Sequence, residues 1–132
     1  MHRTLHGVMA VGIGIGLMAL AHLSPSMSGY GTHQALGLPP CLLTALTGIT
    51  CPSCGLTTSV VHCLHGEWLA ALKANTVGPF LLIGILTIGG ANLYGIVRPF
   101  AWGTVVATAW FHRVVVCAIS ALFLAWGLRG FW

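Results

Sequence analysis

The stretch VGPFLLIGILTIGGANLYGIV, residues 77–97, contains no charged side chain and decides the fold. It ends at Arg98 and Pro99, a cation followed by a residue that interrupts helices. About 20 apolar residues suffice for a helix to cross the hydrocarbon core of a bilayer. Because a single segment satisfies its backbone polar groups in lipid by forming a helix, this stretch predicts a transmembrane helix.

Two other apolar blocks predict two more spans. Residues 7–23 reach the lower limit for crossing, and residues 114–131 reach the interface if Arg129 extends its charged end to the headgroups. We therefore expect an all-α integral membrane protein with about three transmembrane helices, organised as a single membrane domain over residues 1–132. The first block also fits a signal peptide cleaved after Ala21, which would leave two spans. We expect the block to be retained.

The composition agrees with a lipid environment. The chain is 57% hydrophobic and 5% charged, whereas a soluble domain carries about 25% charged residues. The lipid bilayer is therefore the main partner that the composition predicts. The five basic residues are scattered singly and make no basic patch, which excludes a nucleic-acid partner. Their distribution over the predicted loops favours a cytoplasmic N-terminus.

Residues 41–75, between the first two spans, predict a cysteine-rich interfacial segment. Residues 41–48 are apolar but too short to cross, so they dip into the interface or begin a re-entrant hairpin. Residues 54–65 predict a short amphipathic helix with the CxxC at its N-terminal end, and residues 67–75 predict a short surface helix. Residues 99–113 predict a second interfacial element. On a helical wheel, the apolar face carries Leu56, Val60, Cys63 and Leu64, and the opposite polar stripe carries Cys54, Thr58, His62 and His65.

Cys51 and Cys54 lie in a Cys-Pro-x-Cys-Gly turn that has three interpretations. The two sulfurs can form a metal knuckle, with zinc as the metal, in which Gly55 supplies a positive φ. They can form a redox couple at the start of a helix, whose dipole favours the thiolate. They can also be structural, packed in a tight turn or joined by a static disulfide. A zinc site needs two further ligands, from Cys41, Cys117, a histidine elsewhere or another subunit.

His62 and His65 are further candidates for metal ligands. They are spaced i and i+3 and can form a separate two-ligand site, or they can simply face headgroups and water. His62 lies about 12 Å along a helix from Cys54, and zinc–ligand bonds are about 2.0–2.3 Å long. One ion therefore cannot bind both on a straight helix. Cys63, on the apolar face, and Cys117, in the third span, fit small apolar residues.

The cysteine-rich stretch resembles a bacterial family of small membrane proteins known only as a domain of unknown function. The matching residues are Gly48, the run Cys51-Pro52-x-Cys54-Gly55-x-Thr57, the run Leu64-x-Gly66-Glu67, and Asn75. The resemblance implies a location in the bacterial inner (plasma) membrane and a shared cysteine motif, and it brings no reaction with it. The sequence departs from the family pattern at Thr58, where the family has arginine, and at Thr76, where it has proline.

Together these features predict a small polytopic membrane protein that is a non-enzymatic subunit or assembly factor. Its CPxCG turn serves as a structural or metal-binding knuckle, and its protein partner is another membrane protein or a second copy. A single acidic residue leaves few groups besides histidine for acid–base catalysis. The alternative is a membrane thiol–disulfide oxidoreductase that uses Cys51 and Cys54.

Overall fold

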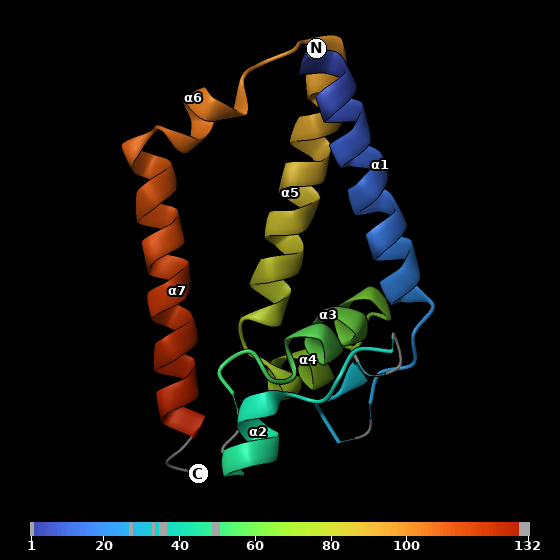
Figure 1. Cartoon of the computed structure of the whole chain (residues 1–132), viewed down its shortest axis with the longest axis vertical. Coiled ribbons are helices and arrows are strands. Elements are labelled where there is room, and N and C mark those ends of the chain that lie inside the picture. The colour runs from blue at the N-terminus through green and yellow to red at the C-terminus, as the bar shows by residue number, and fades with distance from the viewer. Residues whose placement is uncertain (1, 27, 33, 35–36, 49–50, 130–132) are drawn as a thin grey trace.

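Three long helices dominate the computed structural model, which describes residues 2–26, 28–32, 34, 37–48 and 51–129. They are α1 (His2–Ala21), α5 (Gly78–Val97) and α7 (Ala109–Arg129). Each is long and apolar enough to cross a membrane, and the described residues form no strand. The prediction of an all-α membrane protein with three spans is thus confirmed. The three helices alternate in direction, as successive membrane crossings must (Figure 1).

The short segments predicted to lie at the interface are also helical. They form α2 (Leu42–Thr47), α3 (Leu56–Leu64), α4 (Trp68–Ala74) and α6 (Trp102–Val106). The first three gather at one end of the long helices, and α6 lies at the opposite end (Figure 1). Two long helices extend beyond the predicted spans, because α1 begins at His2 and α7 begins at Ala109. A cation near the end of a span does not stop a helix, since its side chain can reach the interface.

Helices α1 and α5 pack against each other in opposite directions. Near one end the ring of His6 lies against Gly95, where a Cβ atom would be 2.7 Å from the ring. Further along, a Cβ atom on Gly89 would be 3.4 Å from a methyl group of Ile13. Small residues of this kind let two helix backbones approach closely in lipid. In contrast, the backbone of α7 lies close to that of α6 and, within the described residues, to no other helix.

A small apolar core lies where α3 and α4 meet the α1–α5 pair. Its members are Val60, Cys63, Ala71 and Leu82, with Leu17, Leu20 and Leu64 packed against them. Helix α3 contributes the largest share of this cluster, namely Val60, Cys63 and Leu64, and it contacts α1, α4 and α5. The predicted apolar face of α3 is therefore correct at Val60 and Cys63.

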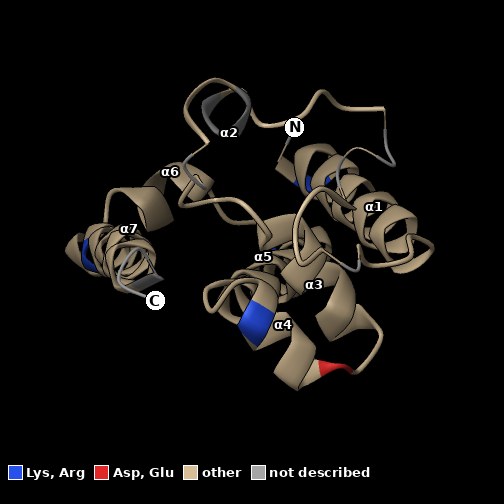
Figure 2. Cartoon of the chain, turned by 90° about the horizontal axis from the view of Figure 1, so that it is seen from below, with Lys and Arg blue, Asp and Glu red and all other residues tan. Residues whose placement is uncertain are grey.

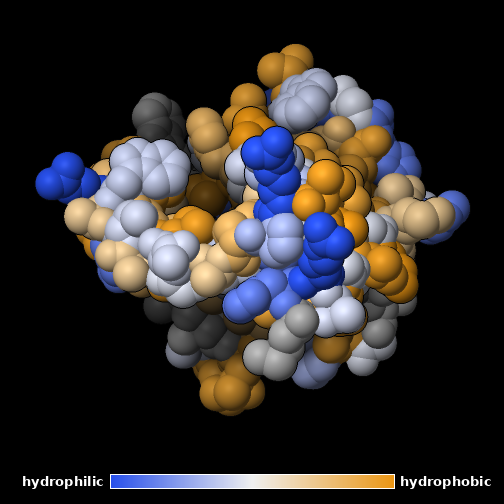
Figure 3. All heavy atoms as spheres, turned by 90° about the horizontal axis from the view of Figure 1, so that it is seen from above, coloured by the Kyte–Doolittle hydropathy of each residue, from blue (hydrophilic) through white to orange (hydrophobic). Residues whose placement is uncertain are grey.

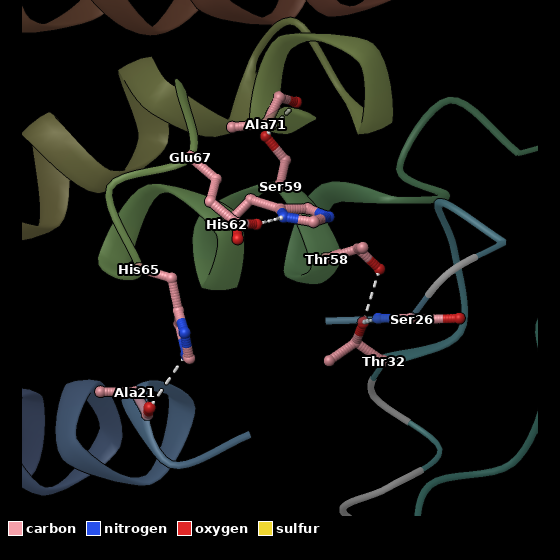
Figure 4. Close-up of polar contacts among 9 residues, drawn as sticks. All are labelled: Ala21, Ser26, Thr32, Thr58, Ser59, His62, His65, Glu67 and Ala71. Atoms are coloured by element: carbon pink, nitrogen blue, oxygen red, sulfur yellow. Dashed lines mark hydrogen bonds and ion pairs between the residues drawn. The ribbon is translucent and has the colours of Figure 1, made fainter. Parts of the chain in front are cut away.

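The predicted polar stripe of α3 is wrong at Thr58. Thr58 is completely buried, and its hydroxyl shares a 2.8 Å hydrogen bond with the hydroxyl of Thr32 from the preceding loop (Figure 4). Its neighbour Ser59 is also completely buried, and its hydroxyl oxygen lies 2.7 and 2.8 Å from the carbonyl oxygens of Ala71 and Asn75, which share its one proton. Helix α3 is thus enclosed on both sides.

The charged side chains lie at the ends of the molecule. Glu67 and Lys73 mark the two ends of α4 in the view from below (Figure 2). Hydrophilic side chains gather at the opposite end, seen from above (Figure 3). At this end the exposed Arg3 lies in the first turn of α1, and the exposed Arg98 follows α5. The long helices between these ends expose large apolar side chains, as contact with lipid requires.

Candidate metal centre

Three cysteine side chains converge beside the start of α3. The sulfur atoms of Cys41, Cys51 and Cys54 all lie within 4.8 Å of one another, and each side chain is half-buried. All three are thiols in the structure. The structure therefore brings the sequence-predicted pair together with Cys41, a residue ten positions before Cys51.

The turn that carries Cys51 and Cys54 is built from backbone hydrogen bonds. The Cys54 amide donates to the Cys51 carbonyl at 2.9 Å, and the Leu56 amide donates to the Ser53 carbonyl at 3.1 Å. Gly55 links this turn to α3 with a φ of +80°, in the left-handed region that favours glycine. The two cysteines are thus held on one side of a tight bend.

Gly55 is also required because other backbone segments crowd it. A Cβ atom at this position would lie 2.5 Å from the carbonyl oxygen of Ala74 and 2.7 Å from that of Gly29. The bend is therefore wedged between the end of α4 and the loop after α1. The glycine of the CPxCG pattern serves both the conformation of the turn and its packing.

Asn75, at the junction of α4 and α5, ties the turn to the rest of the fold. Its side-chain amide donates to the carbonyl oxygens of Pro52 and Cys54, at 3.3 and 3.2 Å. Its side-chain oxygen accepts from the amide of Val77 at 3.0 Å. Asn75 is buried, so these contacts are shielded from water. The family pattern includes Asn75 but does not indicate its role. In the structure, Asn75 fixes the cysteine turn against α5.

His62 and His65 do not join the three cysteines. A ring nitrogen of His62 lies 2.6 Å from a carboxylate oxygen of Glu67, and a ring nitrogen of His65 lies 3.1 Å from the carbonyl oxygen of Ala21 (Figure 4). The His62–Glu67 contact spans the end of α3, where Gly66 adopts a φ of +80°. The His65 contact joins α3 to the end of α1. Both histidines have structural partners of their own.

The remaining two cysteines also lie outside the cluster. Cys63 is buried in the apolar core beside Val60 and Leu82, and this burial raises the pKa of its thiol. A neutral, buried thiol is a poor metal ligand and a poor nucleophile. Cys117 is exposed on α7, away from the three converging sulfurs.

Two hollows flank the cluster. A cavity of about 450 Å³ is lined by Cys41, Cys54 and the side chains of Tyr30 and Gln34. A second hollow, of about 290 Å³, is lined by Cys51, Cys54, Lys73 and Trp126. Cys54 borders both, so small solutes can reach the cluster from two sides. Lys73 adds a positive charge to the lining of the second hollow.

The fold and these residues define a small polytopic membrane protein with a three-cysteine cluster, close enough to bind a metal ion, beside its spans. Residues 41–89 match a family model described as "Protein of unknown function (DUF2752)". This match confirms the resemblance to a family known only as a domain of unknown function. No curated protein and no solved structure matches the chain.

Proposed function

We propose that the protein is a non-enzymatic membrane protein that binds one zinc ion through Cys41, Cys51 and Cys54. The observation that carries this proposal is the convergence of the three sulfur atoms within 4.8 Å. In tetrahedral zinc sites the Zn–S bonds are about 2.3 Å long, which puts sulfurs about 3.8 Å apart. A contraction of about 1 Å therefore suffices to close the three thiols around zinc.

The chemistry of the site favours a soft or borderline metal ion. Thiolates select zinc or monovalent copper over magnesium and calcium, which prefer oxygen ligands. Three thiolates with a divalent zinc ion carry one negative charge, and Lys73 in the adjoining hollow offsets it. With monovalent copper the same ligands would carry two negative charges, which is harder to accommodate next to apolar surface.

Zinc here would act mainly on structure and assembly. It would connect the segment before α2 to the turn before α3, and so fix the region outside the spans. The described residues offer three thiolates, and a fourth ligand is supplied by water or by a partner protein. A fourth ligand from a partner would make the protein a subunit or assembly factor, in keeping with its single acidic residue. The resemblance supports a location in a bacterial inner membrane.

Metal analysis of the purified protein tests this proposal. We expect about one zinc ion per chain for the wild type and loss of that zinc in the Cys41→Ser, Cys51→Ser and Cys54→Ser variants. The matched control is Cys117→Ser, which changes a cysteine outside the cluster and should retain the metal. Retention of zinc by Cys41→Ser and Cys51→Ser, in protein that still unfolds cooperatively, would overturn the assignment.

The second candidate, a thiol–disulfide oxidoreductase, is favoured by the accessibility of Cys51 and Cys54 from the hollow that contains Lys73. In such a reaction Cys51 and Cys54 would lose two electrons and two protons and form a disulfide. A disulfide in a partner protein would accept them and become two thiols. A metal-free wild-type protein whose Cys51–Cys54 pair cycles between thiol and disulfide would establish this function in place of zinc binding. For that function Cys41→Ser should leave the cycling unchanged.

A further inference from the structure

A buried histidine lies at the end of the molecule opposite the cysteines. His6 of α1 is 1% exposed, and both of its ring nitrogens have partners. Nδ1 lies 2.9 Å from Oδ1 of Asn92 in α5, and Nε2 lies 2.9 Å from the carbonyl oxygen of Phe100 in the α5–α6 connection. One ring therefore joins the start of α1 to two segments far along the chain, the end of α5 and the connection that follows it.

The side-chain amide of Asn92 can adopt only one orientation here. Its oxygen accepts a hydrogen bond from the indole nitrogen of Trp102 at 3.1 Å, and its nitrogen donates to the carbonyl oxygen of Ile88 at 2.8 Å. An indole N–H can only donate, and a backbone carbonyl can only accept. Turning the amide would put two donors together at Trp102 and two acceptors together at Ile88. The atom that faces His6 is therefore the amide oxygen.

It follows that both ring nitrogens of His6 face acceptors. A neutral imidazole has a single N–H and can satisfy only one of them, whereas an imidazolium has two. A buried acceptor pressed against a bare ring nitrogen at hydrogen-bond distance is costly. We propose that His6 is a proton-binding site, which holds its proton as a buried imidazolium and thereby ties α1 to α5 and to the connection leading to α6.

The surroundings of His6 accommodate a cation without a carboxylate. Its ring packs on Gly95 in the last turns of α5, where the helix dipole favours positive charge. The ring of Phe100 lies 4.6 Å away, centre to centre, and that of Trp102 6.4 Å away, so their π faces add to the stabilisation. The charge-assisted bonds to Asn92 and Phe100 contribute most, since bonds to ionised donors are about twice as strong as neutral ones.

Other charges near this site oppose the proton. Arg3 lies one turn earlier on α1 and its guanidinium donates to the carbonyl oxygen of Val97 at 3.4 Å. Arg98 follows α5, and the first turns of α1 present the positive end of that helix. Glu67, the single acidic residue of the chain, contacts His62 at the opposite end. Because no anion offsets these cations, neutral acceptors alone hold the proton, and the site can release it.

Loss of the proton has a specific structural consequence. A neutral ring has one N–H for two acceptors. Asn92 is held in place by its hydrogen bond from Trp102, so the carbonyl oxygen of Phe100 is the acceptor that can move away. The connection to α6 is then released from α1. The backbone of α7 lies close to that of α6, and at the other end Trp126 of α7 lines the hollow beside Cys51 and Lys73. Proton binding at His6 therefore controls whether the α5–α6 connection is tied to α1.

Nuclear magnetic resonance of the full-length protein, with isotope-labelled histidine and tryptophan in detergent micelles, tests the proposal. His6 is assigned by the signals lost in His6→Gln, with His112→Gln, which changes an exposed histidine on α7, as the control. We expect two ring N–H signals for His6 at neutral pH. Raising the pH should remove one of them and shift the indole signal of Trp102 at the same time. A single ring N–H at neutral pH in folded protein would overturn the proposal.

The Asn92→Ala variant gives a second, independent reading if His6→Gln fails to fold. Without the amide oxygen only the carbonyl of Phe100 needs a donor, and a neutral ring with its N–H on Nε2 provides it. We therefore expect His6 to lose one of its two N–H signals at neutral pH in Asn92→Ala. If the variant keeps both, the acceptor at Asn92 is not what holds the proton, and the proposal fails.

Discussion

Replacing Gly55 by alanine tests whether the bend before α3 holds the cysteine cluster together. Gly55 has a φ of +80°, and a Cβ atom there would lie 2.5 Å from the carbonyl oxygen of Ala74 and 2.7 Å from that of Gly29. Both neighbours are backbone atoms, so neither can turn away as the end of a flexible side chain can. The substitution thus introduces backbone strain and a steric clash at the same position.

The two contributions can be given separate magnitudes. A left-handed conformation costs an L-residue about 1–2 kcal/mol. Forcing additional atoms into a packed region costs about 1–3 kcal/mol more. We therefore expect Gly55→Ala to lower the free energy of unfolding by about 2–5 kcal/mol. It should also lower zinc affinity, because the clash displaces Cys54 relative to Cys41.

Gly66→Ala is the matched control for the backbone contribution. Gly66 also has a φ of +80°, but nothing lies within 4 Å of the Cβ position. It should lose only about 1–2 kcal/mol and bind zinc as the wild type does. Chemical unfolding in detergent, with zinc per chain measured on the same samples, compares the two variants. Equal losses of stability, or full zinc binding by Gly55→Ala, would refute the packing of this bend.

Three further outcomes follow from individual contacts. Asn75→Ala removes three hydrogen bonds and should cost about 2–3 kcal/mol at about 1 kcal/mol per bond, measured by chemical unfolding together with zinc release to a chelator. In Gly95→Ala the new Cβ atom would lie 2.7 Å from the ring of His6, and we expect a loss of stability of about 1–3 kcal/mol. The control Gly90→Ala has open space around its Cβ position and should be neutral or stabilising. Burial raises the pKa of Cys63, so over a range of alkaline pH the thiol is neutral in the folded protein and ionised in the unfolded protein. The free energy of unfolding is therefore undiminished at neutral pH and falls as the pH rises above about 8.5. Cys63→Ala should abolish that alkaline loss in unfolding curves recorded against pH.

The helices were predictable because their signal is local. A run of apolar residues such as 77–97 demands a helix in lipid whatever its neighbours, and α5 covers Gly78–Val97. The start of α7 at Ala109 was missed because the prediction began the span after Arg113. Charge marks where a span meets the interface, and the helix itself continues past that point.

The metal centre was predictable only in part, since its members come from distant segments. The CPxCG pattern indicated a bend with a positive φ at Gly55, and the structure has that φ. The approach of Cys41 depends on the path of the chain through α2, which no local pattern encodes. The role of Asn75 likewise depends on α4 bringing it back beside the turn.

The error at Thr58 has a general physical cause. The buried side chains of the described residues are as often polar as apolar: His6, Thr32, Thr58, Ser59, Asn75 and Asn92 against Val60, Val61, Cys63, Ala71 and Leu82. Where lipid is the solvent, apolar side chains gain little by leaving it, whereas a polar side chain must find a partner inside the protein. A polar stripe on a helix such as α3 therefore faces inward and joins segments together. The same rule places Asn92 and His6 between α1 and α5, so the polar residues of this chain hold its helices together at both ends, and removing any one of them should cost more than removing a lipid-facing leucine.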